Sequence, residues 1–100
     1  MMEEELRIAD LIREAFRGVV LGDGVGLWQA QAIDDYAGDA AEREQRERDE
    51  KEDWSKIPVD DLNYCHSSPS FFDAAGMRFH LPAFLLADLE GTFQQDIVLR

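Results

Sequence analysis

The sequence predicts a mainly helical protein of four or five helices with one small β-hairpin near residues 70–81, folded as a single domain over residues 1–100. Apolar residues recur at three- and four-residue spacing in the N-terminal third, which is the period of an amphipathic helix. Glutamates precede basic residues by four positions through the middle of the chain, a spacing that supports helices. Two short apolar stretches flank Gly76, a pattern typical of a hairpin.

The first predicted helix covers residues 3–17. Leu6, Ala9, Ile12 and Phe16 recur at helical spacing, with glutamate and arginine between them. Three glutamates at residues 3–5 suit the positive end of the helix dipole, and Gly18 provides a C-terminal stop.

A glycine-rich turn then leads to a second predicted helix at residues 27–36. Gly22, Gly24 and Gly26 lack both the further glycine of a dinucleotide-binding fingerprint and the Lys-Ser/Thr of a P-loop. We therefore interpret this segment as a tight connection. Trp28 and Tyr36 on the following helix are expected to be core or interface residues.

The charged middle segment predicts a third helix over residues 40–56, about 25 Å long and polar on all sides in its middle turns. Asp39 is placed to cap it. Trp54 and Ile57 are expected to anchor its far end, and Pro58 to stop it. One or two further helical turns are predicted at residues 59–65, followed by a loop at 67–70. The four supporting pairs are Glu42–Arg46, Glu44–Arg48, Glu47–Lys51 and Glu52–Lys56.

The C-terminal third is predicted to hold the hairpin and one buried helix. Residues 71–72 and 77–81 are the expected strands, joined by a turn in which Gly76 takes the left-handed conformation. Pro82 is expected to open a helix over residues 83–89 that Gly91 closes, and a short strand is predicted within residues 92–100. The expected core residues are Leu11, Phe16, Leu27, Trp28, Ile33, Phe72, Phe79, Phe84, Leu85 and Leu89.

The charge distribution is the strongest functional signal. The chain has a net charge of −12, and residues 34–61 hold twelve carboxylates against five basic side chains. Such a field repels nucleic acid and anionic membranes and attracts basic surfaces. Direct nucleic-acid binding and membrane binding are therefore not expected. The acidic N-terminus and the absence of a long apolar run predict a cytoplasmic protein.

Cys65, His66 and His80 are the only residues that could serve as soft metal ligands or as a catalytic pair. A lone cysteine excludes an intramolecular disulfide. A structural zinc site normally needs four cysteine or histidine ligands at recognisable spacings. A nucleophilic pair of Cys65 with His80 is conceivable, but a free cysteine is more often a small buried apolar residue. We expect no catalytic residue, no metal and no cofactor.

Two long blocks and a shorter one carry a resemblance to a known family. They read LGDGVGLWQAQAIDDY at residues 21–36, SSPSFFDAAGMRFHLPAF at 67–84 and DEKEDW at 49–54. The chain resembles a family of small uncharacterised bacterial proteins, a domain of unknown function, over roughly residues 12–90. The resemblance implies no activity, substrate or catalytic residue.

The preferred functional hypothesis is a non-catalytic acidic protein that covers a basic, nucleic-acid-binding surface of another protein, such as a nucleoprotein complex. Carboxylates four residues apart on a helix lie about 6 Å from one another, comparable with the spacing of backbone phosphates. In size and charge the chain is similar to phage-type inhibitors, including anti-CRISPR proteins. The residues expected to bind the partner are Asp34, Asp35, Glu44, Glu47, Glu52 and Asp53.

The alternative hypothesis is a small bacterial regulatory or housekeeping domain whose charge serves solubility alone. Ten aromatic residues in 100 leave apolar surface to cover. A homodimer is the commonest closed arrangement. Its interface is predicted to involve Trp28, Tyr36 and Phe71.

Overall fold

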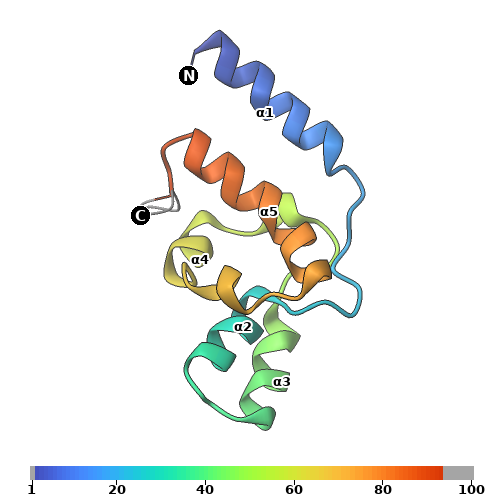
Figure 1. Ribbon diagram of the computed structural model, residues 1–100, viewed down its shortest axis with the longest axis vertical. Coiled ribbons are helices and arrows are strands. Elements are labelled where there is room, and N and C mark those ends of the chain that lie inside the picture. The colour runs from blue at the N-terminus through green and yellow to red at the C-terminus, as the bar shows by residue number, and fades with distance from the viewer. Residues whose placement is uncertain (1, 94–100) are drawn as a thin grey trace.

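The computed structural model describes residues 2–93, and this part of the chain contains helices joined by turns and loops, with no strand (Figure 1). Five α-helices and two short 3-10 helices follow one another. They are α1 (Glu3–Ala15), α2 (Leu27–Asp34), α3 (Asp39–Arg48), η1 (Trp54–Lys56), α4 (Val59–Tyr64), η2 (Ser68–Phe71) and α5 (Ala74–Leu89).

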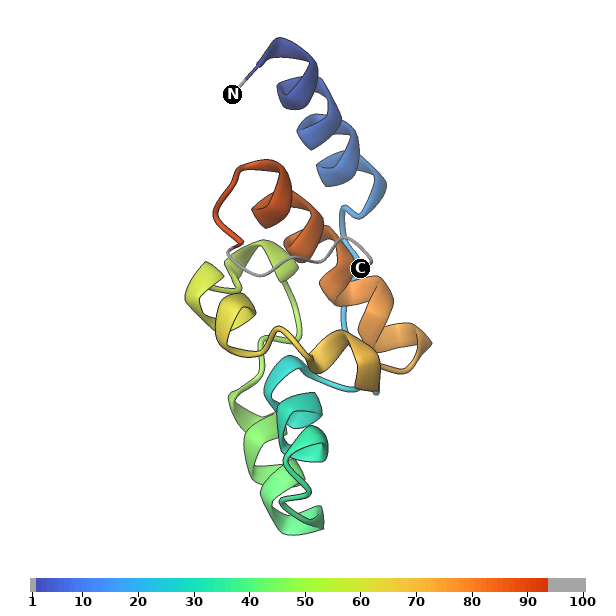
Figure 2. The same cartoon turned by 60° about the vertical axis from the view of Figure 1, so that its left-hand side comes forward.

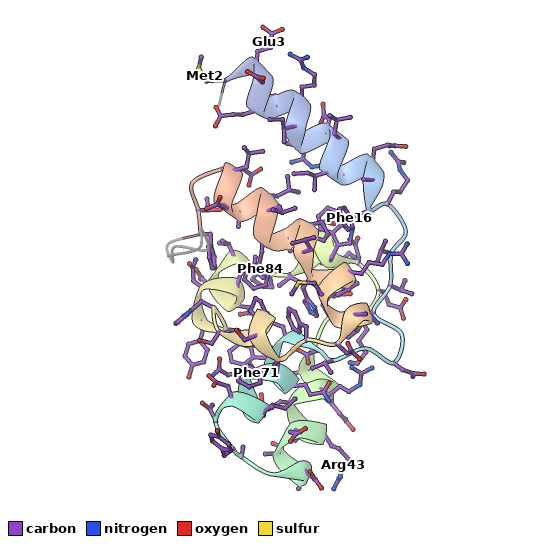
Figure 3. The ribbon with its side chains drawn as sticks, in the orientation of Figure 1. Met2, Glu3, Phe16, Arg43, Phe71 and Phe84 are labelled. Carbon is purple, nitrogen blue, oxygen red and sulfur yellow. The ribbon has the colours of Figure 1, made fainter. Side chains whose placement is uncertain are left out.

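The helices form an elongated molecule with α5 near its middle. Figures 1 and 2 show α1 at one end and the paired helices α2 and α3 at the other. The principal extents are 46 × 30 × 20 Å. Met2 and Glu3 therefore lie at the opposite end of the molecule from Arg43 on α3, as Figure 3 shows.

The core is built around α5, which contributes more buried residues than any other helix of the described part of the chain. Phe79 is fully buried, and Phe84 packs edge-on against Phe93 with 5.4 Å between the ring centroids. Leu21 and Leu27, which flank the glycine turn, are buried in the same cluster. Of the other expected core residues, Phe16, Trp28, Ile33, Phe72, Leu85 and Leu89 are partly buried.

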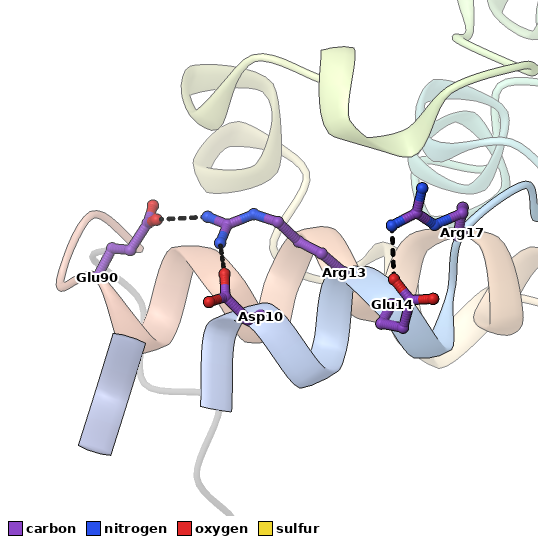
Figure 4. A network of polar contacts seen from close by, with 5 residues as sticks. All are labelled: Asp10, Arg13, Glu14, Arg17 and Glu90. Carbon is purple, nitrogen blue, oxygen red and sulfur yellow. Dashed lines mark hydrogen bonds and ion pairs between the residues drawn. The ribbon is translucent and has the colours of Figure 1, made fainter. Parts of the chain in front are cut away.

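Helix α1 lies against α5 along one narrow face. Ala9 is buried, and Ile12 and Phe16 pack against the core. The prediction of Leu11 as a core residue is wrong, because its side chain is 63% exposed on the far side of α1. Arg13 lies 3.3 Å from Asp10 and 3.5 Å from Glu90, so it links α1 to the end of α5 (Figure 4). Such an exposed ion pair contributes little, about 0–1 kcal/mol.

The predicted hairpin at residues 70–81 is wrong. This segment instead ends η2 and begins α5, whose first turn is capped by Asp73 Oδ1 accepting the Gly76 N–H at 2.8 Å. Gly76 is a helical residue, and a Cβ at this position would lie 2.5 Å from the carbonyl oxygen of Val25. Gly76 is thus required for close packing of two backbones and not for a turn.

The expectation that Pro82 opens a helix is also wrong, because α5 runs through Pro82 and buries it. A proline inside a helix removes one backbone hydrogen bond and normally opposes the helix. Its ring is buried among the apolar residues of α5, and this packing offsets the lost bond. The predicted strand at residues 92–100 lies almost wholly outside the described residues.

The predicted helix over residues 40–56 is wrong in its second half. Helix α3 ends at Arg48, and Asp49 is extended with φ −70° and ψ 141°. The backbone of Lys51 then accepts a 2.8 Å hydrogen bond from the Leu21 N–H, far along the chain. The chain leaves the helix here because the carboxylate of Asp49 turns inward.

Candidate functional site

The acidic segment surrounds a buried polar joint between α2 and the end of α3. Asp49 is only 6% exposed, and its carboxylate accepts the N–H groups of Trp28 at 2.7 Å and Gln29 at 3.1 Å. These are two of the four N–H groups at the start of α2 that have no partner within the helix. Asp49 therefore caps a helix more than 20 residues before it in the chain.

The pKa of Asp49 is raised above its usual range of about 4, and burial is the main cause. The hydrogen bonds from the backbone of Trp28 and Gln29 act in the opposite direction, as do the charges of Lys51 and Arg46. A Cβ at Gly26 would overlap the Asp49 carboxylate, so Gly26 is required for this approach.

Arg46 holds the glycine turn from the same end of α3. Its guanidinium donates to the carbonyl oxygen of Gly22 at 2.7 Å and to that of Gly24. On the other side of the turn, Asp73 Oδ1 accepts the Val25 N–H at 3.0 Å. The glycine turn is thus a structural junction of α2, α3 and α5, as the sequence interpretation of a tight connection implies.

Three of the five basic side chains of the acidic segment contact other groups of the protein. Besides Arg46, the guanidinium of Arg48 lies 3.9 Å from the centroid of the Trp28 ring. Lys51 Nζ donates to the backbone oxygen of Asp49 at 2.9 Å. The sequence predicts that these bases pair with glutamates four residues earlier. Their contacts in the structure are instead with backbone oxygens, with an indole and with the side chains of Gln29 and Gln45.

Several carboxylates are also engaged internally. Glu50 accepts the backbone N–H groups of Glu52 at 3.1 Å and Asp53 at 3.0 Å. Asp53 Oδ1 accepts from the Ser55 hydroxyl at 2.6 Å, and the bonds to Ser55 hold the pKa of Asp53 below its usual range. Asp61 accepts from the indole N–H of Trp28 at 3.3 Å. These groups stabilise the turns after α3.

The six residues predicted to bind a partner come from three parts of the chain. Asp34 and Asp35 lie at the end of α2, Glu44 and Glu47 on α3, and Glu52 and Asp53 in the segment before η1. Glu52 and Asp53 line a shallow cavity of about 370 Å³ together with Arg13 and Arg17 from the end of α1. The exposed members of the set are Asp35, Glu44, Glu47 and Glu52.

Glu44 and Glu47 are the two members of this set that are exposed together on one helix. They are three residues apart on α3, and both are exposed, whereas Glu42 and Arg46 on the side that meets α2 are half-buried. Residues three apart on a helix share a face at about 5–6 Å. We call Glu44 and Glu47 the α3 acidic face. Arg43 and Arg48, which are also exposed, flank it.

The three residues predicted for a dimer interface have different environments. Tyr36 is 95% exposed and takes a left-handed backbone conformation with φ 54°. Phe71 is 36% exposed, whereas Trp28 is half-buried between Arg48 and Tyr64, whose ring centroid lies 5.1 Å away. A group of exposed apolar side chains also lies on α1, namely Leu6, Ile8 and Leu11.

Cys65 and His80 are both buried. Burial, together with the nearby charges of Asp61 and Asp49, raises the pKa of the Cys65 thiol to about 12, so it is protonated at neutral pH. A protonated thiol is a poor nucleophile. Within residues 2–93 no group of three or more His, Cys, Asp or Glu side chains is placed to hold a metal ion. No helix of the same part of the chain is long and apolar enough to cross a membrane.

Over residues 2–93 the fold is built from helices, and the acidic segment adjoins the joint between α2 and α3 at Asp49. The chain belongs to a family of unknown function, DUF6714, whose sequence profile matches residues 3–99. This match confirms the resemblance to an uncharacterised family. No curated protein and no solved structure matches the chain.

Sequence reasoning missed the structural roles of Asp49 and Arg46. Both lie in a run of charged residues where each position looks alike. A weak signal was available in Gly26, because glycine directly before a helix leaves space for a group from elsewhere in the chain. The partner of that glycine could not be read from the sequence.

Proposed function

We propose that this protein is a non-catalytic acidic interaction protein of the cytoplasm that binds a basic surface on another protein, and that the α3 acidic face is the centre of contact. The observation that supports this most is the engagement of Arg46 and Lys51 with backbone oxygens. Glu44 and Glu47 remain exposed on the same helix.

The position of the α3 acidic face also suits a contact with a large partner. Helices α2 and α3 project from one end of the molecule (Figure 1). An exposed helix at such an end can enter a groove that normally receives a nucleic-acid backbone. In this proposal the protein acts as an inhibitor of anti-CRISPR type, which competes with nucleic acid for a basic, nucleoprotein-forming surface.

Charge reversal with a matched control tests the proposal. Glu44→Lys with Glu47→Lys changes the net charge by four units on the α3 acidic face. Glu3→Lys with Glu4→Lys changes it equally at the opposite end of the molecule. Each variant and the wild type are used to capture proteins from a bacterial lysate at low and high salt, and the association rate of the captured basic protein is measured.

We expect the α3 variant to lose the partner and the α1 variant to retain it. The association rate should fall at least tenfold at low salt, and the difference should shrink as salt rises, because exposed charges are screened over about 8 Å at physiological ionic strength. Excess wild-type protein should also displace DNA or RNA from that partner. Equal losses in both variants, or no displacement, would contradict the proposal.

A second candidate function is that of a regulatory or housekeeping domain that acts as a homodimer. The exposed apolar side chains of α1 favour it, since Ile8 and Leu11 are 41% and 63% exposed next to the face that meets α5. Light scattering at high protein concentration should then give about twice the 11.4 kDa chain mass, and Leu11→Glu should return the monomer. A monomer in the wild type would rule this candidate out.

A further inference from the structure

A cavity of about 290 Å³ lies where the start of α2, the end of α3, the η1–α4 connection and α5 meet. Its walls include the indole of Trp28, the aliphatic side chain of Ile57, and the polar side chains of Asp61 and His80. This volume is near the lower end of the range of about 300–1,000 Å³ for small-molecule pockets. It exceeds the roughly 30 Å³ that one water molecule occupies.

His80, one of the residues that line this cavity, has an unsatisfied polar atom. The residue is fully buried, and its Nδ1 lies 2.7 Å from the backbone oxygen of Gly76. Because a carbonyl oxygen only accepts hydrogen bonds, Nδ1 carries the proton and Nε2 presents a lone pair. Nε2 is buried and has no hydrogen-bond partner within the described residues. Buried polar atoms normally have a hydrogen-bond partner, and Nε2 is an exception within the described residues.

The imidazole ring is held in a fixed orientation. Phe72 stacks on it with 4.4 Å between centroids, and Phe79 meets it edge-on at 5.0 Å. Nδ1 is turned back to the backbone of its own helix, which leaves the opposite edge of the ring, with Nε2, without a hydrogen bond within the described residues. Burial lowers the pKa of His80 from its ordinary 6.5 to about 4, and the ring is neutral at pH 7.

Asp61 supplies a second acceptor on the same cavity. Its Oδ2 accepts the Trp28 indole N–H at 3.3 Å, and a carboxylate can take several further donors. Asp49, another lining residue, already accepts two backbone N–H groups. The charged lining residues are three carboxylates and two bases, a net negative set: Asp49, Glu50, Asp61, Arg48 and Lys56.

We propose that this cavity is a binding site for a small organic compound with a primary ammonium group, whose N–H donors are accepted by His80 Nε2 and the Asp61 carboxylate. An ammonium group has three donors and no acceptor, which matches two acceptors in a net negative site. The Trp28 indole forms part of the wall beside Asp61, and Arg48 lies over its ring.

Nitrogen NMR of the full chain tests the site directly. Protein labelled with ¹⁵N is titrated with ethylammonium chloride, and with sodium acetate at equal ionic strength as an acceptor-only probe of similar size. The signals followed are those of His80 Nε2 and the Trp28 indole N–H. The exposed His66 serves as an internal reference for non-specific effects.

We expect ethylammonium to shift the His80 Nε2 and Trp28 signals saturably, without the same change at His66, and acetate to leave them in place. His80→Phe keeps an aromatic ring of similar size, and Asp61→Asn keeps the shape of the side chain. Each should weaken ethylammonium binding at least tenfold, the typical loss for removing one partner of a buried hydrogen bond.

Asp60→Asn is the matched control, because Asp60 is the exposed neighbour of Asp61 and does not line the cavity. It should bind ethylammonium like the wild type. Asp61 is itself only half-buried, so Asp61→Asn can test the site even if His80→Phe does not fold. The absence of a saturable shift, an equal response to acetate, or equal weakening by Asp60→Asn and Asp61→Asn would overturn the proposal.

Discussion

The buried imidazole of His80 makes the folding stability of this protein depend on pH. His80 is neutral in the folded state because burial lowers its pKa to about 4, whereas the unfolded chain has the ordinary value of 6.5. Below pH 6.5 the unfolded state therefore binds more protons than the folded state. The stability that neutral His80 confers is complete above pH 6.5 and is lost as pH falls towards 4.

This difference predicts a specific acid sensitivity. Between pH 7.5 and pH 5 the wild type should lose about 2 kcal/mol of unfolding free energy through His80 alone. His80→Phe should lack this component, and its remaining pH dependence should reflect other groups such as Asp49, whose pKa is raised by burial. Urea unfolding of both proteins at the two pH values measures the difference. Parallel losses in wild type and variant would show that His80 does not titrate in this way.

Gly76 carries a second residue-scale prediction. In an open helix, replacing glycine by alanine stabilises by about 1 kcal/mol. Here the added Cβ would lie 2.5 Å from the Val25 oxygen and 3.0 Å from Asp73 Oδ1, so the glycine turn and α5 would be forced apart. Gly76→Ala should therefore destabilise by about 1–3 kcal/mol, the range for overpacking.

The control for Gly76→Ala is Ala74→Gly at the exposed start of the same helix. It should cost less than about 1 kcal/mol, in line with propensity alone. Both values come from thermal or urea unfolding. A stabilised Gly76→Ala protein would mean that the backbones do not meet as closely as described.

At the scale of elements, the joint between α2 and α3 depends on Asp49. Asp49→Ala would leave the N–H groups of Trp28 and Gln29 without their partners, and it should cost about 2–4 kcal/mol. Asp49→Asn retains one acceptor oxygen and should give an intermediate loss. Unfolding free energies of the two variants measure this order.

Glu47→Ala provides the comparison, because Glu47 is exposed on the same helix. Its effect should stay within about ±0.5 kcal/mol. Hydrogen exchange at the first turn of α2 should also quicken in Asp49→Ala and not in Glu47→Ala. Equal exchange in the two variants would argue against a capping role for Asp49.

At the scale of the whole molecule, the net charge of −12 opposes compaction. Raising sodium chloride from about 10 to 150 mM shortens the screening length from about 30 to 8 Å, and the melting temperature should rise. Glu44→Gln with Glu47→Gln should melt higher than the wild type at low salt, with a smaller difference at high salt. Calorimetry measures both. A melting temperature independent of salt would mean that repulsion is already balanced by internal pairs.

The local patterns of the sequence determined α1, α2 and α4 to within a few residues. In each of these helices the apolar spacing and the residues that start and stop the helix involve only near neighbours in the sequence. Packing in the core favours the same helical conformation. The composition also shows that the protein is strongly acidic and has a single cysteine. The mainly helical character was therefore readable, although the added hairpin was wrong.

Tertiary structure alone decided the end of α3, the start of α5 and the positions of the buried polar groups. Asp49 leaves its helix because its carboxylate finds N–H groups 20 and 21 residues earlier in the chain. Gly76 and Pro82, which suggest a turn and a helix start, are held inside α5 by the Val25 backbone and by burial. A sequence pattern reports neighbours along the chain, whereas these choices depend on partners that become neighbours only when the chain folds.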